Sequence, residues 1–299
     1  MDSVLECLPR GSRVAILRLR SLGDCVLTTP ALDILKRFRP DLHLAVFVEN
    51  RFREIFEGNT DLAEIHLPEL ASLRRFRPQL CLNLHGGTRS AWMTELSGAR
   101  YRAGFGHYRQ QFVYNVHIPR AQEILHVDRT VHTAEHLASA IFFLGATVCE
   151  IPRAKLFQAG NAPPTIEPRS AVIHAVAATP EKTWAPANFL GVAAQLVDSG
   201  VSPVFIGGPE DDLTPFRQYR TLQSSLSDLK SVLAAATLFV GNDSGPAHMA
   251  AAFGVPSVII FGPSDPAIWG PWRTTGEVVA MDSGVSHVLG ALQRLRVPA

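Results

Sequence analysis

The chain has 299 residues, of which 46% are hydrophobic and 18% charged, and its formal net charge is +1. This length and composition are typical of a globular protein with one large domain or two ordinary ones. A net charge near zero argues against a dedicated nucleic-acid-binding protein. The charge is uneven, however: residues 1–160 carry 20 basic and 16 acidic side chains, and residues 161–299 carry 8 and 11. A basic first half suits an anionic partner, although ordinary solvated charge explains it equally well.

Cysteine spacing and hydropathy indicate where the protein works. Cys7, Cys25, Cys81 and Cys149 are far apart and form no C-x-x-C pair. This spacing predicts reduced thiols in a cytosolic protein, and neither a disulfide framework nor a zinc site. The first residues contain no apolar segment of signal-peptide length. No apolar run approaches the roughly 18 residues of a membrane span, so any membrane association is predicted to be peripheral.

Strand-like and helix-like patterns alternate through the first half. Residues 14–17 and 44–48 are predicted strands, and apolar residues at helical spacing predict a helix over 22–38. Shorter elements are predicted at residues 51–57, 65–67, 70–75 and 80–84, the last ending at His85-Gly86-Gly87, and a longer helix at 128–144. Such alternation predicts βαβ units and a parallel sheet.

The pattern restarts after residues 159–170, which contain three prolines and are the predicted linker. Strands are then predicted at 171–174, 204–206, 238–240 and 258–261, and helices at 187–199, 229–236, 246–253 and about 285–295. The sequence therefore predicts two Rossmann-like halves with a crevice between them. Ligands of such sheets gather at the carboxyl ends of the strands.

Residues 239–248 are predicted to form a strand, a tight polar turn and the start of a helix. Ser244 is placed to N-cap that helix, Gly245 lets a phosphate approach the backbone, and Gly254 ends the helix. Free N–H groups and the positive end of the helix dipole make such a turn an anion site. His248, one turn into the helix, is placed either to contact the anion or to serve as a structural histidine. In isolation, the favoured interpretation of the whole turn is a simple connection between a strand and a helix.

Three further candidates follow strand ends. Asp24 lies after the first strand, either as a helix cap or as a base that accepts a proton from a substrate hydroxyl. Lys182 is either a phosphate clamp or a surface lysine. Glu210 and Asp211 are placed either to bind ribose hydroxyls or to cap the next helix.

The sequence gives little support for metallopeptidase, hydride-transfer or P-loop chemistry. Residues 132–136 fit the H-x-x-E-H zinc-peptidase pattern, but no clear third ligand follows, and an amphipathic helix is the favoured interpretation. The sequence has no G-x-G-x-x-G after a strand and no G-x-x-x-x-G-K-[ST]. Hydride transfer and P-loop hydrolysis therefore lose their main support.

Taken together, five motifs resemble those of glycosyltransferase family 9, the lipopolysaccharide heptosyltransferases. Residues 22–32 resemble the family's G-D-x-x-x-T-x-P-A-L signature, and residues 182–186 its K-x-W-P segment with one extra residue. Residues 207–211 resemble G-x-P-x-E/D, residues 243–248 D-[ST]-G-x-x-H, and residues 261–266 G-P-[ST]-D-P. Each motif is weak alone, but five in order are specific, and they cover nearly the whole chain.

The resemblance implies an α/β protein of the GT-B fold, with two Rossmann-like domains facing each other across a cleft. An acceptor domain would span residues 1–164 and a nucleotide-sugar domain residues 165–284, and a helix over 285–299 would pack back on the first domain. The implied enzyme is a cytosolic monomer at the inner membrane that moves heptose from ADP-heptose to the Kdo–lipid A core. The transfer would proceed with inversion, without a metal or other cofactor and without nucleic acid.

The resemblance also implies roles for individual residues. Asp24 would be the general base, with Arg18, Arg20, Gly23 and Thr28 on the acceptor side. On the donor side, Lys182, Ser244, Gly245 and His248 would bind the diphosphate, Asp243 would contact the donor or organise the loop, and Asp211 or Glu210 would bind the ribose. Without a metal, the charge growing on the leaving ADP must be met by Lys182 and a helix N-terminus.

One departure from the family concerns the strand after the linker, which members usually follow with H-P-G. Here the residues are His174-Ala175-Val176, and a valine side chain where glycine would give clearance bears on the identity of the donor. Val176 also favours an alternative from another class, a GT-B module that binds a nucleotide sugar without transferring it. A GT-B-like sugar-nucleotide epimerase is a third interpretation.

Overall fold

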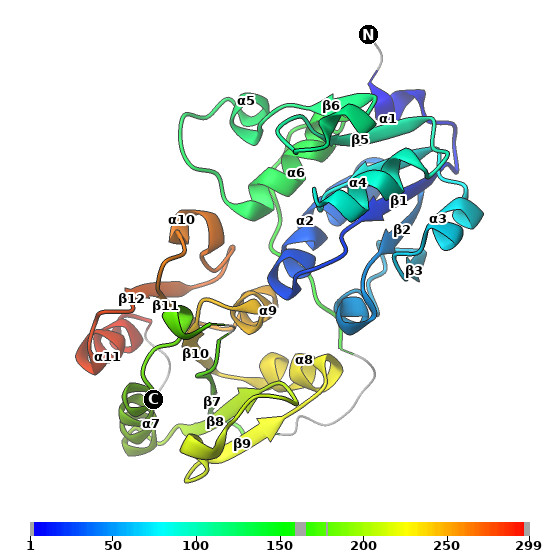
Figure 1. Cartoon of the computed structure of the whole chain (residues 1–299). Coiled ribbons are helices and arrows are strands. Elements are labelled where there is room, and N and C mark those ends of the chain that lie inside the picture. The colour runs from blue at the N-terminus through cyan, green and yellow to red at the C-terminus, as the bar shows by residue number, and fades with distance from the viewer. Residues whose placement is uncertain (1–2, 159–165, 178, 296–299) are drawn as a thin grey trace. The chain divides into compact units, whose positions relative to one another are not determined.

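The computed structural model describes residues 3–158, 166–177 and 179–295. The chain divides into two compact units, residues 1–152 and 153–299, and each contains one six-stranded sheet (Figure 1). Most of the predicted linker, residues 159–165, lies outside the described residues. The segment before it, 153–158, belongs to the second unit, where Ala154 and Leu156 are buried. The units therefore divide earlier in the chain than residue 164.

The sheet of the N-terminal unit has the strand order β3-β2-β1-β4-β5-β6, and neighbouring strands are parallel. Its strands are β1 (Arg13–Leu17), β2 (His43–Phe47), β3 (Glu64–His66), β4 (Leu80–Asn83), β5 (Tyr101–Phe105) and β6 (Val116–Ile118). Its helices are α1 (Val4–Cys7), α2 (Leu22–Phe38), α3 (Leu70–Phe76), α4 (Thr88–Glu95), α5 (Ala121–Leu125) and α6 (Thr133–Phe143), with 3-10 turns η1 (Asn50–Ile55) and η2 (Gln111–Val113).

The apolar, buried strands of this unit form the middle of its sheet. The last four residues of β1 and all four of β4 are buried, so these apolar runs form the middle of the sheet. Helix α2 is buried from Cys25 to Leu35 and packs against α6, which fixes the loop that follows β1. All four cysteines are free thiols, as predicted.

The sheet of the C-terminal unit has the order β12-β11-β10-β7-β8-β9, again with parallel neighbours. Its strands are β7 (Ser170–His174), β8 (Ser202–Gly207), β9 (Arg220–Gln223), β10 (Leu238–Asn242), β11 (Ser257–Phe261) and β12 (Gly276–Ala280). Its helices are α7 (Pro186–Asp198), α8 (Leu226–Ala235), α9 (Gly245–Phe253), α10 (Pro266–Trp269) and α11 (Val285–Arg294), with 3-10 turns η3 (Pro180–Lys182) and η4 (Thr214–Phe216).

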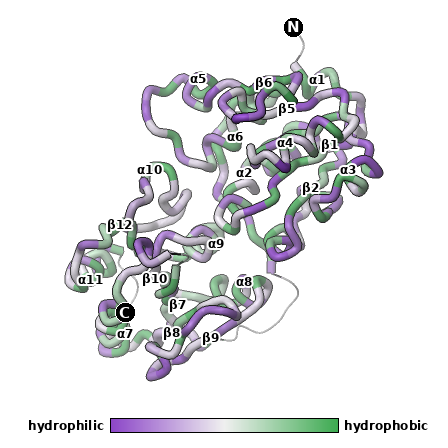
Figure 2. The backbone as a smooth tube through the Cα atoms, viewed as in Figure 1, coloured by the Kyte–Doolittle hydropathy of each residue, from purple (hydrophilic) through white to green (hydrophobic). Residues whose placement is uncertain are grey.

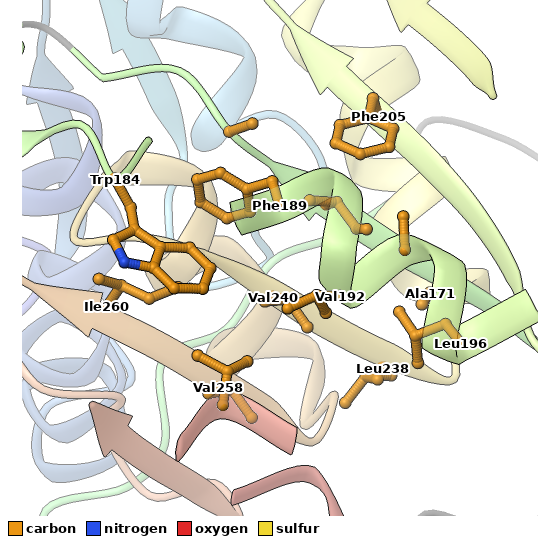
Figure 3. Packing of buried hydrophobic residues seen from close by; sticks show 14 of the residues in the cluster. Ala171, Trp184, Phe189, Val192, Leu196, Phe205, Leu238, Val240, Val258 and Ile260 are labelled. Carbon is orange, nitrogen blue, oxygen red and sulfur yellow. The ribbon is translucent and has the colours of Figure 1, made fainter. Parts of the chain in front are cut away.

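The core of this unit lies between the sheet and helix α7 (Figure 3). Phe189 of α7 is fully buried, and the rings of Trp184 and Phe189 meet edge to face with centroids 5.1 Å apart. Val240 and Ile260 from the central strands complete the cluster around them. Since Trp184 lies two residues after Lys182, this core also anchors the loop that carries that lysine.

Helix α11 packs within the C-terminal unit. Its buried residues Val288 and Ala291 join the same core, and the helix contacts α7, β11 and β12. Within its own unit, the apolar face of the described helix covers α7 and the β11–β12 side of the sheet. The expectation that residues 285–299 pack back on the first domain stays a prediction.

Both sheets share one topology. In each, the first strand of the unit lies in the middle and the strand order reverses beside it, between β1 and β4 and between β7 and β10. In open α/β sheets such a reversal opens a crevice at the carboxyl ends of the two strands, where ligands bind. The two predicted Rossmann-like halves are thus confirmed, and the two switch points are the places to look for functional groups.

Candidate functional site

Asp24 lies in the first turn of α2, directly after β1. Ser21 is the N-cap of the helix, and its hydroxyl donates to Asp24 Oδ2 at 2.9 Å. The Ser21 backbone N–H also donates to Asp24 Oδ2 at 3.5 Å, so Asp24 completes a capping box at the start of its helix, which was one of the two predicted roles. Its side chain is 24% exposed, so the same carboxylate remains open to a ligand.

Arg18 holds the other oxygen of that carboxylate. It follows β1, is only 4% exposed, and places Nη1 3.4 Å from Asp24 Oδ1. Its Nη2 donates to the carbonyl of Leu84, just after β4. The guanidinium thus spans the switch point between β1 and β4 and fixes the carboxylate against it.

The other predicted acceptor-side residues differ in accessibility. Arg20 is exposed, whereas Gly23 and Thr28 are buried in α2. The Thr28 hydroxyl donates to the Asp24 carbonyl at 2.7 Å, so Thr28 supports the helix turn from inside. Of these three residues, only Arg20 is open to an acceptor.

His85 is a member of this site that the sequence did not single out. It follows β4, where Asn83 Oδ1 accepts the backbone N–H of His85 at 3.0 Å. Burial lowers the pKa of His85, and the nearby charges of Arg18 and Arg20 lower it further. The His-Gly-Gly sequence after a predicted strand was the available signal. We call Arg18, Ser21, Asp24 and His85 the Asp24 cluster.

The H-x-x-E-H segment has a structural role. His132 is the N-cap of α6, its Nδ1 accepts the N–H of Ala134 at 3.1 Å, and Glu135 accepts the His132 N–H at 2.8 Å. Glu135 also pairs with Arg129 at 2.6 Å, and His136 stacks on Phe105 with ring centroids 3.9 Å apart. No group of three metal-ligating side chains occurs in the described part of the chain. The segment does begin a helix, as the favoured interpretation predicted, but its polar side chains are not all outside, because His132 is only 7% exposed.

Lys182 connects three loops of the C-terminal unit. It ends the turn η3 after β7, and its Nζ donates to Ser264 Oγ at 2.8 Å and lies 3.4 Å from Asp243 Oδ2. Asp243 follows β10 and Ser264 follows β11. Lys182 and Asp243 were both predicted. Ser264 lay within a recognised motif but was not predicted as a site residue.

The Lys182 loop is held in place by its neighbours. The backbone N–H of Trp184 donates to Asn242 Oδ1 at 3.0 Å, and its indole Nε1 donates to the Ser283 carbonyl at 3.2 Å. A Cβ on Gly262 would lie 2.8 Å from the Glu181 carbonyl, so only glycine allows this approach. The lysine thus sits on a fixed loop, which is what a binding group needs.

Ser244 forms a pair that the sequence did not predict. It is the N-cap of α9, yet its side chain makes no capping bond. Its hydroxyl instead lies 3.0 Å from Nδ1 of His174, the last residue of β7. Burial lowers the pKa of His174 to about 4, so this histidine is neutral at physiological pH. We call His174, Lys182, Asp243, Ser244 and Ser264 the Lys182 cluster.

The remaining predicted donor residues occupy varied environments. Gly245 begins α9 at the second switch point, and His248 is 5% exposed, with its ring 6.3 Å from that of Trp269. Asp211 Oδ2 accepts the Gly208 N–H at 2.7 Å, so Asp211 closes its own turn. Glu210 is exposed beside it. The charge of Asp211 acts on the pKa of His174, which places it near the Lys182 cluster.

Val176 stands where the family motif has glycine, two residues after the end of β7. Its side chain is partly buried and packs against the core of the C-terminal unit. The effect of this valine on the clearance for a donor phosphate, and so on donor identity, stays a prediction.

Comparison with solved structures identifies the fold. A glycosyl transferase family 9 protein from Veillonella parvula has a TM-score of 0.82 at 21% identity, covering 95% of this chain and 97% of that one. The E. coli heptosyltransferase WaaC, solved with ADP, has a TM-score of 0.78 at 20% identity, covering 95% and 99%. The chain therefore has the fold of the GT-B glycosyltransferases.

The sequence comparisons identify the family. The model of "Glycosyltransferase family 9 (heptosyltransferase)" matches residues 70–279, and the chain belongs to this family. Among curated proteins, lipopolysaccharide heptosyltransferase 3 of E. coli is 26% identical over 294 residues, spanning 85% of this chain and 84% of the relative. The protein is thus a glycosyltransferase, as its motifs predicted.

Proposed function

We propose that this protein transfers heptose from ADP-heptose to the Kdo/heptose inner core of lipopolysaccharide, with inversion at the anomeric carbon. The observation that carries this proposal is the division of groups between the two switch points. A carboxylate lies at one switch point, and a lysine beside a helix N-terminus lies at the other. Nucleophilic displacement of a diphosphate needs a base for the acceptor and a positive site for the leaving group.

The Lys182 cluster supports the donor role. An ammonium group has three N–H donors, and among the described residues two are directed at Asp243 and Ser264. The first turn of α9 adds free backbone N–H groups and the positive end of a helix dipole. Together they offset the negative charge that grows on ADP as the bond to the sugar breaks, with Asp243 keeping the lysine in place.

The Asp24 cluster supports the acceptor role. Each carboxylate oxygen has two lone pairs, and Arg18 and Ser21 engage one oxygen each, so capacity remains for an acceptor hydroxyl. In the proposed step the acceptor oxygen bonds to the anomeric carbon opposite the diphosphate. The anomeric carbon–oxygen bond to the diphosphate breaks, and the hydroxyl proton passes to Asp24.

Further parts of the proposal follow from the same charges. Lys182 and the α9 N-terminus supply the positive charge that a divalent metal would otherwise bring to the diphosphate, so we propose metal-independent transfer. Glu210 or Asp211 would bind the ribose, and Ser244, Gly245 and His248 would bind the diphosphate. We further propose that the enzyme works as a cytoplasmic monomer at the inner membrane.

Incubation with ADP-heptose and Kdo-lipid A tests the function directly. The expected result is a mass increase of one heptose on the lipid, unchanged by EDTA. Binding of ADP-heptose without transfer would favour the non-catalytic module. Conversion of a UDP-sugar with no acceptor present would identify an epimerase.

A further inference from the structure

A stretch of the N-terminal unit is strongly basic although the whole chain is nearly neutral. Residues 74–109 contain seven arginines and a single acidic residue, Glu95. That acid is already paired, since Glu95 Oε2 lies 3.2 Å from Nε of Arg102. None of the seven arginines belongs to the Asp24 cluster, so the proposed chemistry does not account for them.

Two aromatic side chains lie exposed within the same region. Trp92 of α4 is 48% exposed and Phe112 of η2 is 70% exposed, and their rings meet edge to face at 6.1 Å. The inner sides of both elements already pack within the protein, because Ala91 and Val113 are buried together in a small core. The exposed pair is therefore additional apolar surface that the fold itself does not use.

Two arginines flank the aromatic pair. Arg89 lies one helical turn before Trp92, and Arg109 belongs to the loop before η2; both are exposed. Gln110 Nε2 donates to Thr88 Oγ1 at 3.1 Å, which ties this loop to the start of α4. Arg89 donates to the Pro68 carbonyl at 2.8 Å and keeps its charge. We call Arg89, Trp92, Arg109 and Phe112 the basic aromatic face.

We propose that the basic aromatic face docks the enzyme on an anionic membrane surface. Tryptophan and phenylalanine enter the interface between headgroups and acyl chains, while neighbouring arginines are attracted to anionic lipid. In the part of the chain that the structure describes, no helix has the length and hydropathy of a membrane span. A second copy of the face would instead bring arginines against arginines. The choice of a lipid surface rests on the proposed function, whose acceptor is a membrane lipid.

Co-sedimentation with phosphatidylglycerol/phosphatidylcholine vesicles tests the proposal. The wild-type protein is expected to bind these vesicles, to bind pure phosphatidylcholine far more weakly, and to be released by high salt. Arg89→Gln combined with Arg109→Gln is expected to weaken partitioning by roughly 25-fold, at about fivefold per arginine. Phe112→Ser is expected to weaken it roughly tenfold or more.

Matched control variants show whether a loss of vesicle binding is specific to this face or follows from any loss of surface charge or apolar surface. Arg10→Gln with Arg51→Gln removes the same charge from exposed positions of the same unit, and Val148→Ser removes an apolar side chain that is 64% exposed. Both controls are expected to bind vesicles within about twofold of the wild type, because neither touches the face. Equal losses in the face variants and the controls would overturn the proposal.

Turnover on a deacylated, water-soluble acceptor keeps this test distinct from the proposed function. The face variants are expected to retain kcat/KM there, because they lie outside both clusters. If the wild type turns over but binds no anionic vesicle, the docking surface is wrong and the enzyme assignment stands. If Phe112→Ser changes the sedimentation mass and leaves vesicle binding unchanged, the face is an interface between copies and the proposal also fails.

Discussion

At the scale of single residues, the pair His174 and Ser244 explains how a serine can be kept ready for a phosphate. A hydroxyl has one proton to donate. If neutral His174 donates its Nδ1 proton to Ser244 Oγ across their 3.0 Å contact, the serine proton is left for the diphosphate. Burial favours this neutral form, because it lowers the pKa of His174 to about 4.

Substitution of His174 tests this pairing. His174→Leu is expected to weaken ADP about fivefold, the worth of one hydrogen bond near 1 kcal/mol, and to leave adenosine binding unchanged. His174→Asn should keep most of the affinity, because its amide N–H replaces the Nδ1 proton. Combined with Ser244→Ala, His174→Leu should add little further loss of ADP affinity. Fully additive losses by calorimetry, or equal weakening of adenosine, would show that the two side chains act separately.

The sequence revealed those site residues that stand inside recognisable motifs. Asp24, Lys182 and Asp243 each follow a predicted strand, and they became site candidates because five family motifs occur together in order. Ser264, His174 and His85 were missed because their partners come from other loops, which the sheet brings together. The contact between Arg18 and one oxygen of Asp24 depends on the pairing of β1 with β4. The order of residues along the chain does not predict that pairing.

At the scale of elements, the central strands β1, β7, β10 and β11 and the long helices were predictable, whereas β5, β6, β9 and β12 were not. β1, β7, β10 and β11 are continuous apolar runs, and α2 and α9 begin and end at recognisable residues. The edge strand β9 is Arg-Thr-Leu-Gln and largely hydrophilic (Figure 2), so it has no such signal. Pairing with a neighbouring strand, rather than local preference, makes β5, β6, β9 and β12 into strands.

The capping box of α6 gives a prediction at this scale. Glu135→Gln is expected to lower stability by about 1 kcal/mol, a shift of about 2–4 °C in Tm, because it weakens the cap and the Arg129 pair. Turnover should not change, since the segment is structural. Calorimetry measures the shift, and exposed Glu69→Gln is the matched control.

The pH dependence of that stabilisation has a definite sign. The hydrogen bond from Arg129 is the main cause that holds the pKa of Glu135 below its usual 4.5. The difference in the free energy of unfolding between the wild type and Glu135→Gln should therefore be complete at neutral pH and fall as the pH drops below about 4.5. An advantage that grows on acidification would contradict the assigned ion pair.

At the scale of the whole molecule, one topology occurs twice and, in the proposed mechanism, serves two different roles, deprotonation of the acceptor and binding of the leaving group. The switch point of the N-terminal unit holds a carboxylate fixed by Arg18, and that of the C-terminal unit holds Lys182 beside a helix N-terminus. Two Rossmann-like halves were predictable from the alternation of elements. The extent of each unit was not, because residues 153–158, before the Pro-rich segment, belong to the second unit, where Ala154 and Leu156 are buried.

This division predicts that binding and chemistry can be separated by substitution. Lys182→Ala is expected to weaken ADP by roughly 1.5–3 kcal/mol, the range for a charge-assisted hydrogen bond, and to slow turnover as well. Asp24→Ala is expected to leave ADP binding nearly intact, because the carboxylate lies on the other unit. The two variants therefore serve as controls for each other.

The most direct test of the account is heptose transfer by Asp24→Ala, measured alongside its affinity for ADP. A positioned general base contributes about 10²–10⁴-fold, so turnover should fall by that factor while the Kd for ADP stays within about twofold. Turnover close to that of the wild type would contradict the assignment of Asp24 as the base, and with it the proposed mechanism.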